Sequence, residues 1–87
     1  MNTYRLIISS PDGDVWNDEV AVLIVRGVMG DLAVMAGHIP FMTSVKPCDC
    51  KIELPDGTIK LGHTNGGLLT VSSDNVTLLS GSFVWKE

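Results

Sequence analysis

The chain has 87 residues, a formal net charge of −4 at pH 7 and a charged fraction of only 18%. A chain of this length can build one modest hydrophobic core, so a second domain is excluded and residues 1–87 are expected to form a single domain. The acidic balance argues against nucleic acid and anionic lipid as ligands, because both need clustered Lys and Arg.

Gly, Pro, Asn and Asp interrupt the chain at short intervals, and β-branched residues lie between the interruptions. This spacing is typical of an all-β sandwich or barrel. The expected strands are, in chain order, Tyr4–Ser9, Val15–Arg26, Leu32–Met35, Phe41–Val45, Asp49–Leu54, Thr58–Thr64, Leu68–Ser72 and Asn75–Leu79. Val15–Arg26 is long for one strand, and its alternation changes phase near Asp18 and Glu19, which predicts a bend that lets this segment serve two sheets.

The predicted fold class is all-β, a flattened two-sheet antiparallel β-sandwich or barrel of roughly eight to ten strands. Alternation along these strands predicts the core, which comprises Leu6, Ile8, Val15, Val20, Val22, Ile24, Leu32, Val34, Val45, Ile52, Ile59, Leu61, Leu69, Val71, Val76 and Leu78. The mean hydropathy of +0.27 is high for a small chain. Either this core is dense or some apolar surface is kept for a partner.

The longest uninterrupted apolar run, Val20–Val25, is far shorter than the ~20 residues that a membrane-spanning helix needs. The first five residues lack the apolar region of a signal peptide. We therefore expect a cytosolic or membrane-peripheral protein.

The residues able to carry chemistry form no recognisable site. Cys48 and Cys50 are separated by one residue, so in a strand they share a face, and this is not the Cys-x-x-Cys spacing that wraps zinc. Residues 62–67, GHTNGG, contain no Lys for a phosphate-binding loop. No metal, no cofactor and no catalytic residue is expected.

Residues 27–47 carry the most specific pattern. Gly27 and Gly30 lead into a short strand, a Gly-His-Ile-Pro corner follows, and the next strand ends at Lys46-Pro47. This stretch resembles the corresponding part of the amino-terminal β-domain of the ATP synthase epsilon subunit, and the matching residues are Gly30, Asp31, Leu32, Gly37, His38, Pro40 and Thr43. The resemblance covers the whole chain, because Tyr4–Ser10 is similar to the family's first strand and Gly66-Gly67-Leu68 to a later glycine corner.

The resemblance implies a central-stalk (rotor) subunit of a bacterial-type F1Fo ATP synthase. Such a subunit binds the gamma subunit and the c-ring and couples ion-driven rotation to ATP synthesis without catalysing a reaction. The implied location is peripheral, on the cytoplasmic face of the bacterial cell membrane, and no homo-oligomer is expected. Residues 80–87 are too few for the two helices that usually follow in this family.

The resemblance also implies two interfaces, which we expect on opposite edges of the body. The gamma-subunit interface is expected at Ser10, His38, Pro40, Met42 and Thr43. The c-ring interface is expected at Gly27, Met29, Gly30 and Asp31. His38 has a second interpretation, as a structural histidine whose ring nitrogen ties down a loop.

Two other functions remain open at this point. One is a free-standing β-sandwich adaptor that binds another protein, because sandwiches host unrelated tasks. The other is a metal-dependent hydrolase that uses Cys48, Cys50 and His63. Binding to gamma separates the first alternative from a rotor subunit, and metal analysis of the purified protein tests the second.

Overall fold

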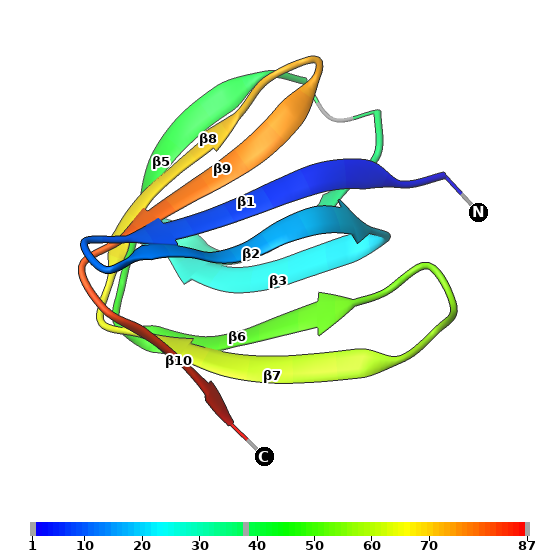
Figure 1. The fold of residues 1–87 in the computed structure, drawn as a ribbon. Coiled ribbons are helices and arrows are strands. Elements are labelled where there is room, and N and C mark those ends of the chain that lie inside the picture. The colour runs from blue at the N-terminus through cyan, green and yellow to red at the C-terminus, as the bar shows by residue number, and fades with distance from the viewer. Residues whose placement is uncertain (1, 38, 87) are drawn as a thin grey trace.

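The computed structural model describes residues 2–37 and 39–86, and over this part the chain is all-β (Figure 1). The strands of the described part are β1 Tyr4–Ser10, β2 Gly13–Val20, β3 Val22–Gly27, β4 Gly30–Met35, β5 Phe41–Val45, β6 Cys48–Glu53, β7 Ile59–Thr64, β8 Gly67–Val71, β9 Asn75–Ser80 and β10 Phe83–Lys86. The predicted fold class is confirmed. The sequence pattern found each of these segments except β10, and it merged β2 with β3.

The strands form one hydrogen-bonded path that divides into two halves (Figure 1). The path runs β10–β7–β6–β3–β5–β8–β9–β1–β2, and β4 pairs with β3. One half therefore contains β4, β3, β6, β7 and β10, and the other contains β5, β8, β9, β1 and β2. Among the described strands, the halves are joined where Gly27 of β3 pairs with Val45 of β5. The pairings are antiparallel except for β1 with β9, which alternation alone did not reveal.

The chain passes from one half to the other at Ala21, between β2 and β3. Val20 and Ala21 are both buried, so the alternation of inward and outward residues changes phase here. The backbone N–H of Ala21 donates to the carbonyl of Glu53 at 2.8 Å, which starts the pairing of this segment with β6. The predicted bend is present, but it lies at Ala21 and not near Asp18 and Glu19, which are both exposed.

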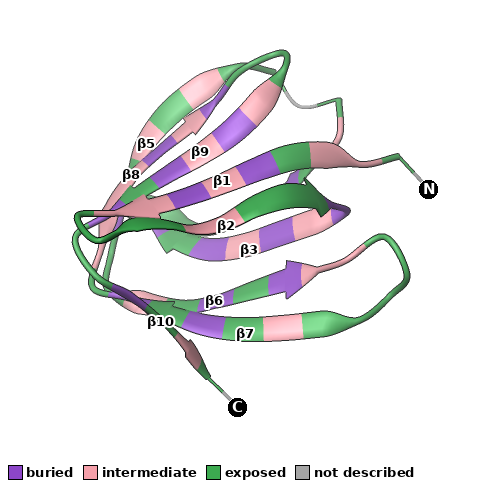
Figure 2. Cartoon of the chain, in the orientation of Figure 1, coloured by how far each residue is buried: buried purple, intermediate pink, exposed green. Residues whose placement is uncertain are grey.

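The core lies between the halves and takes alternate positions of the strands (Figure 2). It consists of Leu6, Ile8, Val20, Leu23, Val25, Val34, Val45, Cys50, Ile52, Leu69, Val71, Val76, Leu78 and Phe83. Val22 and Ile24 were predicted in this set, but Leu23 and Val25 take the inward positions because the phase changes at Ala21. The predicted core residues Val15 and Leu32 pack against the cluster while remaining partly exposed.

Strand β7 has its apolar side turned outward. Ile59 and Leu61 were predicted as core residues, but they are 42% and 46% exposed, so this prediction is wrong. The inward positions belong to Lys60, Gly62 and Thr64. The Phe83 ring occupies the space in which a side chain at position 62 would lie. A Cβ at that position would be 2.6 Å from Cε1 of the ring, so only glycine fits.

The two ends of the strand path meet at a cluster that we term the closing seam, formed by Trp16, Lys60, Phe83 and Trp85. The rings of Trp16 on β2 and Trp85 on β10 meet edge to face with centroids 5.9 Å apart, and Phe83 meets Trp85 at 5.0 Å. The Lys60 ammonium lies 4.6 Å from the Trp85 ring centroid and 5.4 Å from that of Trp16. Aromatic and cation–π contacts therefore close the body at the seam.

Candidate functional site

The predicted ring-side residues lie on the hairpin between β3 and β4. Gly27 pairs with Gly30 at the base of the hairpin, and Val28 and Met29 form its tip. Gly30 has a φ of +125°, which glycine adopts easily and residues with a Cβ rarely do, and this allows the tight reversal. The Met29 side chain at the tip is 93% exposed.

Backbone hydrogen bonds to the other half hold this hairpin in place. The Val28 N–H donates to the carbonyl of Ser44 at 3.2 Å, and the Lys46 N–H donates to the carbonyl of Arg26 at 2.9 Å. Both bonds flank the Gly27–Val45 pair that joins the halves. The exposed tip is therefore carried on a base that is fixed by paired backbone and not on a free loop.

An apolar groove, termed here the tip groove, opens between β4 and β5 next to this junction. It has a volume of about 260 Å³. Its lining residues are Gly27, Met29, Gly30, Leu32, Phe41, Met42 and Thr43. Leu32 and Phe41 pack on the core from its floor, while Met42 is 64% exposed. The groove can accept an apolar side chain from a partner.

Asp31, the fourth predicted ring-side residue, is paired within the hairpin. The Arg26 Nε donates to Asp31 Oδ1 at 2.9 Å, and both side chains are more than half exposed. This hydrogen bond and the carboxylate charge raise the pKa of Arg26. Solvent screens an exposed pair, so it adds little to stability. Arg26 and Asp31 line a separate pocket with Pro47 and Cys48 and do not line the tip groove.

The predicted gamma-side residues do not gather in one place. Met42 and Thr43 line the same groove as Gly27 and Met29, so for these residues the expectation of opposite edges is wrong. The cause is the pairing of β3 with β5, which alternation does not report. His38, which belongs to the same predicted interface, lies outside the described residues.

Ser10 and Pro40 lie at opposite ends of the body. Ser9 of β1 pairs with Leu79, close to the residue at which β9 ends. From there the pairs Ser80–Gly67 and Gly67–Val45 lead across the sheet to the base of the β3–β4 hairpin. Ser10 is therefore at the hairpin end, where its Oγ donates to the Gly13 carbonyl at 3.2 Å. Pro40 precedes β5, which starts at the other end and runs toward the hairpin, and it is exposed.

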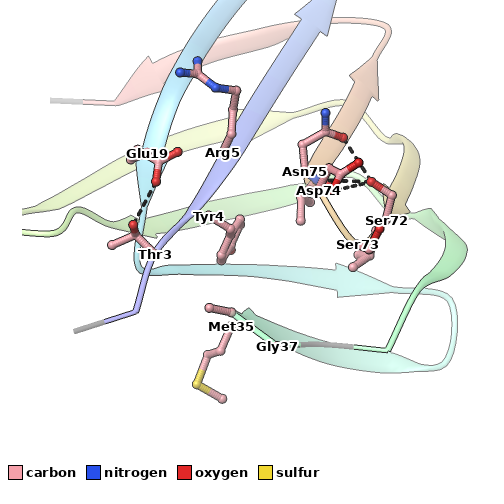
Figure 3. Close-up of a pocket in the computed structure, with 13 residues that line it drawn as sticks. Thr3, Tyr4, Arg5, Glu19, Met35, Gly37, Ser72, Ser73, Asp74 and Asn75 are labelled. Carbon is pink, nitrogen blue, oxygen red and sulfur yellow. Dashed lines mark hydrogen bonds between the residues drawn. The ribbon is translucent and has the colours of Figure 1, made fainter.

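A larger cavity of about 430 Å³ lies at the end away from the hairpin (Figure 3). It is bordered by the start of β1, the β8–β9 turn and the end of β4. The Thr3 Oγ1 donates to Glu19 at 2.8 Å, and the Ser72 Oγ donates to the Asn75 carbonyl at 2.8 Å (Figure 3). These polar groups bind one another, so they are engaged in holding the turn and the strand end together.

The cysteines and His63 lie on different faces of the sheet. Cys48 and Cys50 share one face of β6, as predicted, and both pack on the core; burial raises the pKa of Cys50 to about 12. His63 faces outward, and its Nδ1 lies 2.9 Å from Asp49 Oδ1. The thiol of Cys50 and the ring of His63 therefore do not converge, and the described residues contain no cluster of three or more His, Cys, Asp or Glu able to hold a metal.

Sequence reasoning missed Leu32 and Phe41 as groove residues. Leu32 was predicted as core and Phe41 as part of a strand, and each also packs on the core. The only sequence signal was the pair of apolar neighbours Phe41 and Met42, one of which must face outward in a strand. Which strand would lie across from them depends on the β3–β5 junction.

The amino-acid sequence matches the model of one protein family over residues 3–86, and that family is described as ATP synthase, Delta/Epsilon chain, beta-sandwich domain. Proteins named ATP synthase epsilon chain from three strains of Clostridium perfringens are each 30% identical to it over all 87 residues. The chain spans 65% of the length of each of these relatives.

Two solved structures share the fold. A chain in the mitochondrial ATP synthase of Euglena gracilis superposes with a TM-score of 0.90 at 21% identity, over 95% of this chain and 53% of that one. A chain in the central stalk and c-ring structure of the Tetrahymena thermophila mitochondrial ATP synthase superposes with a TM-score of 0.75 at 13% identity, over 94% of this chain and 66% of that one.

Within the described residues, no helix has the length and apolar character needed to span a bilayer. Because the family model matches almost the entire sequence, the chain belongs to the family of ATP synthase delta/epsilon chain β-sandwich domains.

Proposed function

We propose that this chain is a central-stalk (rotor) subunit of an F1Fo ATP synthase. It binds the gamma subunit and the c-ring, turns with them and transmits ion-driven rotation toward ATP synthesis. The family match over residues 3–86 supports this role, as do relatives named ATP synthase epsilon chain. The structural observation that carries it is the tip groove, an exposed apolar groove in the part of the chain that matches the family's corner.

A subunit of this kind must be stiff, because a body that deforms under load loses rotation between its two contacts. The two halves are joined by backbone pairing at Gly27 and Val45 and by rings at the closing seam. A third link crosses the interior, where the Tyr4 hydroxyl on β1 donates to the Val34 carbonyl on β4 at 2.7 Å. Burial raises the pKa of Tyr4, so this hydroxyl keeps its proton and remains a donor.

The two partners are assigned to the tip groove with its hairpin and to the corner that precedes β5. The tip groove and the hairpin tip form the ring-side contact. The corner before β5 forms the gamma-side contact, where Ile39 is 81% exposed and Pro40 is also exposed. Met42 lines the tip groove and, two residues after Pro40, extends that contact toward the corner.

The proposed role is mechanical, so the subunit carries out no bond chemistry and catalysis belongs to other subunits. The location follows from the partners, as a peripheral part of the complex on the cytoplasmic face of the bacterial membrane. The mechanical role is supported over the metal-dependent hydrolase by the divergence of Cys50 and His63, because a buried thiol and an outward-facing ring on opposite faces of the sheet cannot bind one metal ion together.

Purified chain mixed with the gamma subunit of its own complex tests the role directly. We expect a stable one-to-one complex by native mass spectrometry, and a further complex when a detergent-solubilised c-ring is added. Failure of the folded chain to bind gamma would remove the rotor assignment and favour the free-standing adaptor. Circular dichroism on the same sample verifies that the chain is folded.

A further inference from the structure

A second apolar groove, which we term the turn groove, lies toward the end of the body away from the tip groove. It opens between the end of β2 and the turn from β6 to β7, and it has a volume of about 280 Å³. Its lining residues are Trp16, Asp18, Glu19, Leu54, Pro55 and Asp56. Because β2 belongs to one half of the body and the turn to the other, the groove bridges the two halves where β2 ends the strand path.

The floor of the turn groove is apolar and formed before any partner binds. Trp16 and Leu54 both pack against the core from partly exposed positions. Backbone hydrogen bonds hold the turn, since the Leu54 N–H donates to the Thr58 carbonyl at 2.8 Å and the Gly57 N–H donates to the Leu54 carbonyl at 2.9 Å. A partner therefore does not have to order this floor, which lowers the free-energy cost of binding.

Three carboxylates border the floor, and each is oriented by a hydrogen bond. Asp18 Oδ1 accepts from the Glu19 backbone N–H at 2.7 Å, and Glu19 Oε1 accepts from the Thr3 hydroxyl at 2.8 Å (Figure 3). Asp56 Oδ1 accepts from the Thr58 backbone N–H at 2.9 Å. This bond lowers the pKa of Asp56, so the carboxylate stays ionised at neutral pH.

No cation of the described residues neutralises these carboxylates. None of the ion pairs within residues 2–37 and 39–86 involves the three acidic residues of the rim. The nearest strands supply two cations, and both are engaged elsewhere. Arg5 Nη1 donates to Asn17 Oδ1 at 2.6 Å, and the Lys60 ammonium lies 4.6 Å from the centroid of the Trp85 ring. The rim therefore offers negative charge to a partner.

The shape of the groove and its charge together select the occupant. The rim carboxylates do not gather round one point, since the described part of the chain has no cluster of three or more His, Cys, Asp or Glu able to hold a metal ion. An arginine side chain fits better. Its apolar stem suits the floor, and its planar guanidinium can reach separate carboxylates and stack on the Trp16 indole. A lysine ammonium is a point charge without a plane to stack.

We propose that the turn groove is a docking site for an arginine side chain of a partner protein, whose stem lies against Trp16 and Pro55 and whose guanidinium binds Asp18 and Asp56. This inference goes beyond the rotor role. It adds a third contact surface, made of residues that neither the ring-side contact nor the gamma-side contact includes.

The test is an NMR titration of the folded chain with the peptide acetyl-Gly-Arg-Gly-amide. The control peptide carries citrulline in place of arginine, which has nearly the same shape and no charge. We expect the arginine peptide to shift the indole N–H signal of Trp16 and the backbone signals of residues 54–58 until they saturate. The citrulline peptide should bind at least about tenfold more weakly, because it lacks the charge that strengthens the hydrogen bonds.

Two variants test the rim. Asp18→Asn and Asp56→Asn each remove one charge and keep a side-chain oxygen for the existing hydrogen bond, and each should weaken binding of the arginine peptide about threefold to fivefold. Asp74→Asn is the matched control. Asp74 is an exposed carboxylate on the β8–β9 turn at the same end of the body, and it does not line the groove. This control should change affinity by less than about twofold.

The outcomes decide the proposal. A saturable shift at the groove that is weakened by both rim variants, and not by Asp74→Asn, supports the docking site. Equal losses from Asp74→Asn and Asp56→Asn overturn it in favour of attraction to overall negative charge. Equal binding of the citrulline peptide, or no saturable shift with the unmodified chain, also overturns it. The rotor assignment stands or falls separately, on binding to gamma and the c-ring.

Discussion

The closing seam and the tip groove both carry large apolar side chains, but the seam packs them against one another and the groove exposes them to solvent. At the seam, Phe83 is buried and the rings of Trp16 and Trp85 meet edge to face around Lys60. At the groove, Met29 and Met42 stand in solvent on a base of paired backbone. Both regions join the two halves of the body, one through side chains and the other through hydrogen bonds.

The difference shows how one small core can serve both stability and binding. At the groove, backbone pairing joins the halves, so the side chains there are free to contact a partner. At the seam, β2 and β10 form no backbone pairing within the described residues, so their side chains connect the halves and are not available to a partner. Changes at the seam should therefore alter stability, and changes at the groove should alter binding.

The largest expected effect is at the seam. Phe83→Ala removes a buried ring from the core and leaves a cavity, so we expect a loss of about 3–5 kcal/mol in the free energy of unfolding. Denaturant titration measures it. Val84→Ala, on the same strand but exposed, is the control and should change stability by less than about 0.5 kcal/mol. Equal effects of the two would show that β10 does not close the core.

Gly62→Ala should be the next most severe change. The added methyl group would meet the Phe83 ring, and overpacking of this kind costs about 1–3 kcal/mol. Thermal unfolding of the single variant and of Gly62→Ala combined with Phe83→Leu tests the cause. The smaller side chain at 83 should remove part of the penalty, and strict additivity would contradict the proposed contact.

Lys60→Met tests the charged part of the seam. It keeps most of the aliphatic chain but removes the ammonium that lies over both indole rings, so we expect a loss of about 0.5–1 kcal/mol. The chain has two tryptophans, and both are in the seam, so intrinsic fluorescence reports this region alone. An unchanged emission spectrum and unchanged stability would remove the cation–π contribution.

Met42→Ser sharpens the comparison from the other side. Because Met42 is largely exposed, its replacement should change the free energy of unfolding by less than about 0.5 kcal/mol. Its effect should appear in the affinity for the ring. Chemical denaturation of the free chain is the measurement, and a loss as large as that of Phe83→Ala would place Met42 in the fold and not in the contact surface.

The smallest expected effect depends on pH. Hydrogen bonds from His63 and Lys86 lower the pKa of Asp49 below its ordinary value of 3.8. A lowered pKa means that the charged form stabilises the fold above 3.8 and that this contribution is lost as the pH falls through the lower folded value. The difference in denaturation midpoint between the natural chain and Asp49→Asn should therefore shrink under acid, and a constant difference would exclude the linkage.

Most of the strands could be predicted from the sequence because turn residues and alternation are local signals. Phe41–Val45 was predicted with the bounds that the structure has. Alternation fails where it must choose between faces. Ile59 and Leu61 alternate with polar residues as core residues do, but Lys60 is inward because two indole rings receive its ammonium. Strand β10 was missed because its support from Gly62 and Trp16 is distant in sequence.

The tip groove could be predicted only in part, for the same reason. The hairpin residues Gly27 and Gly30 follow from a local glycine pattern, so the residue types at the tip were within reach of the sequence. The approach of Met42 from β5 depends on the single register pair between Gly27 and Val45, which no local pattern encodes. The ion pair between Arg26 and Asp31 likewise needs the register of β3 against β4.

The parallel pairing of β1 with β9 has a consequence for the way the protein is made. Arg5 pairs with Asn75, so β1 must wait for its partner until β9 has been synthesised. Contacts between such distant residues slow folding, and until they form the apolar side chains of Leu6 and Ile8 lack their final cover. The folded surface that an assembling rotor recognises therefore exists only once β9 has been synthesised and has paired with β1.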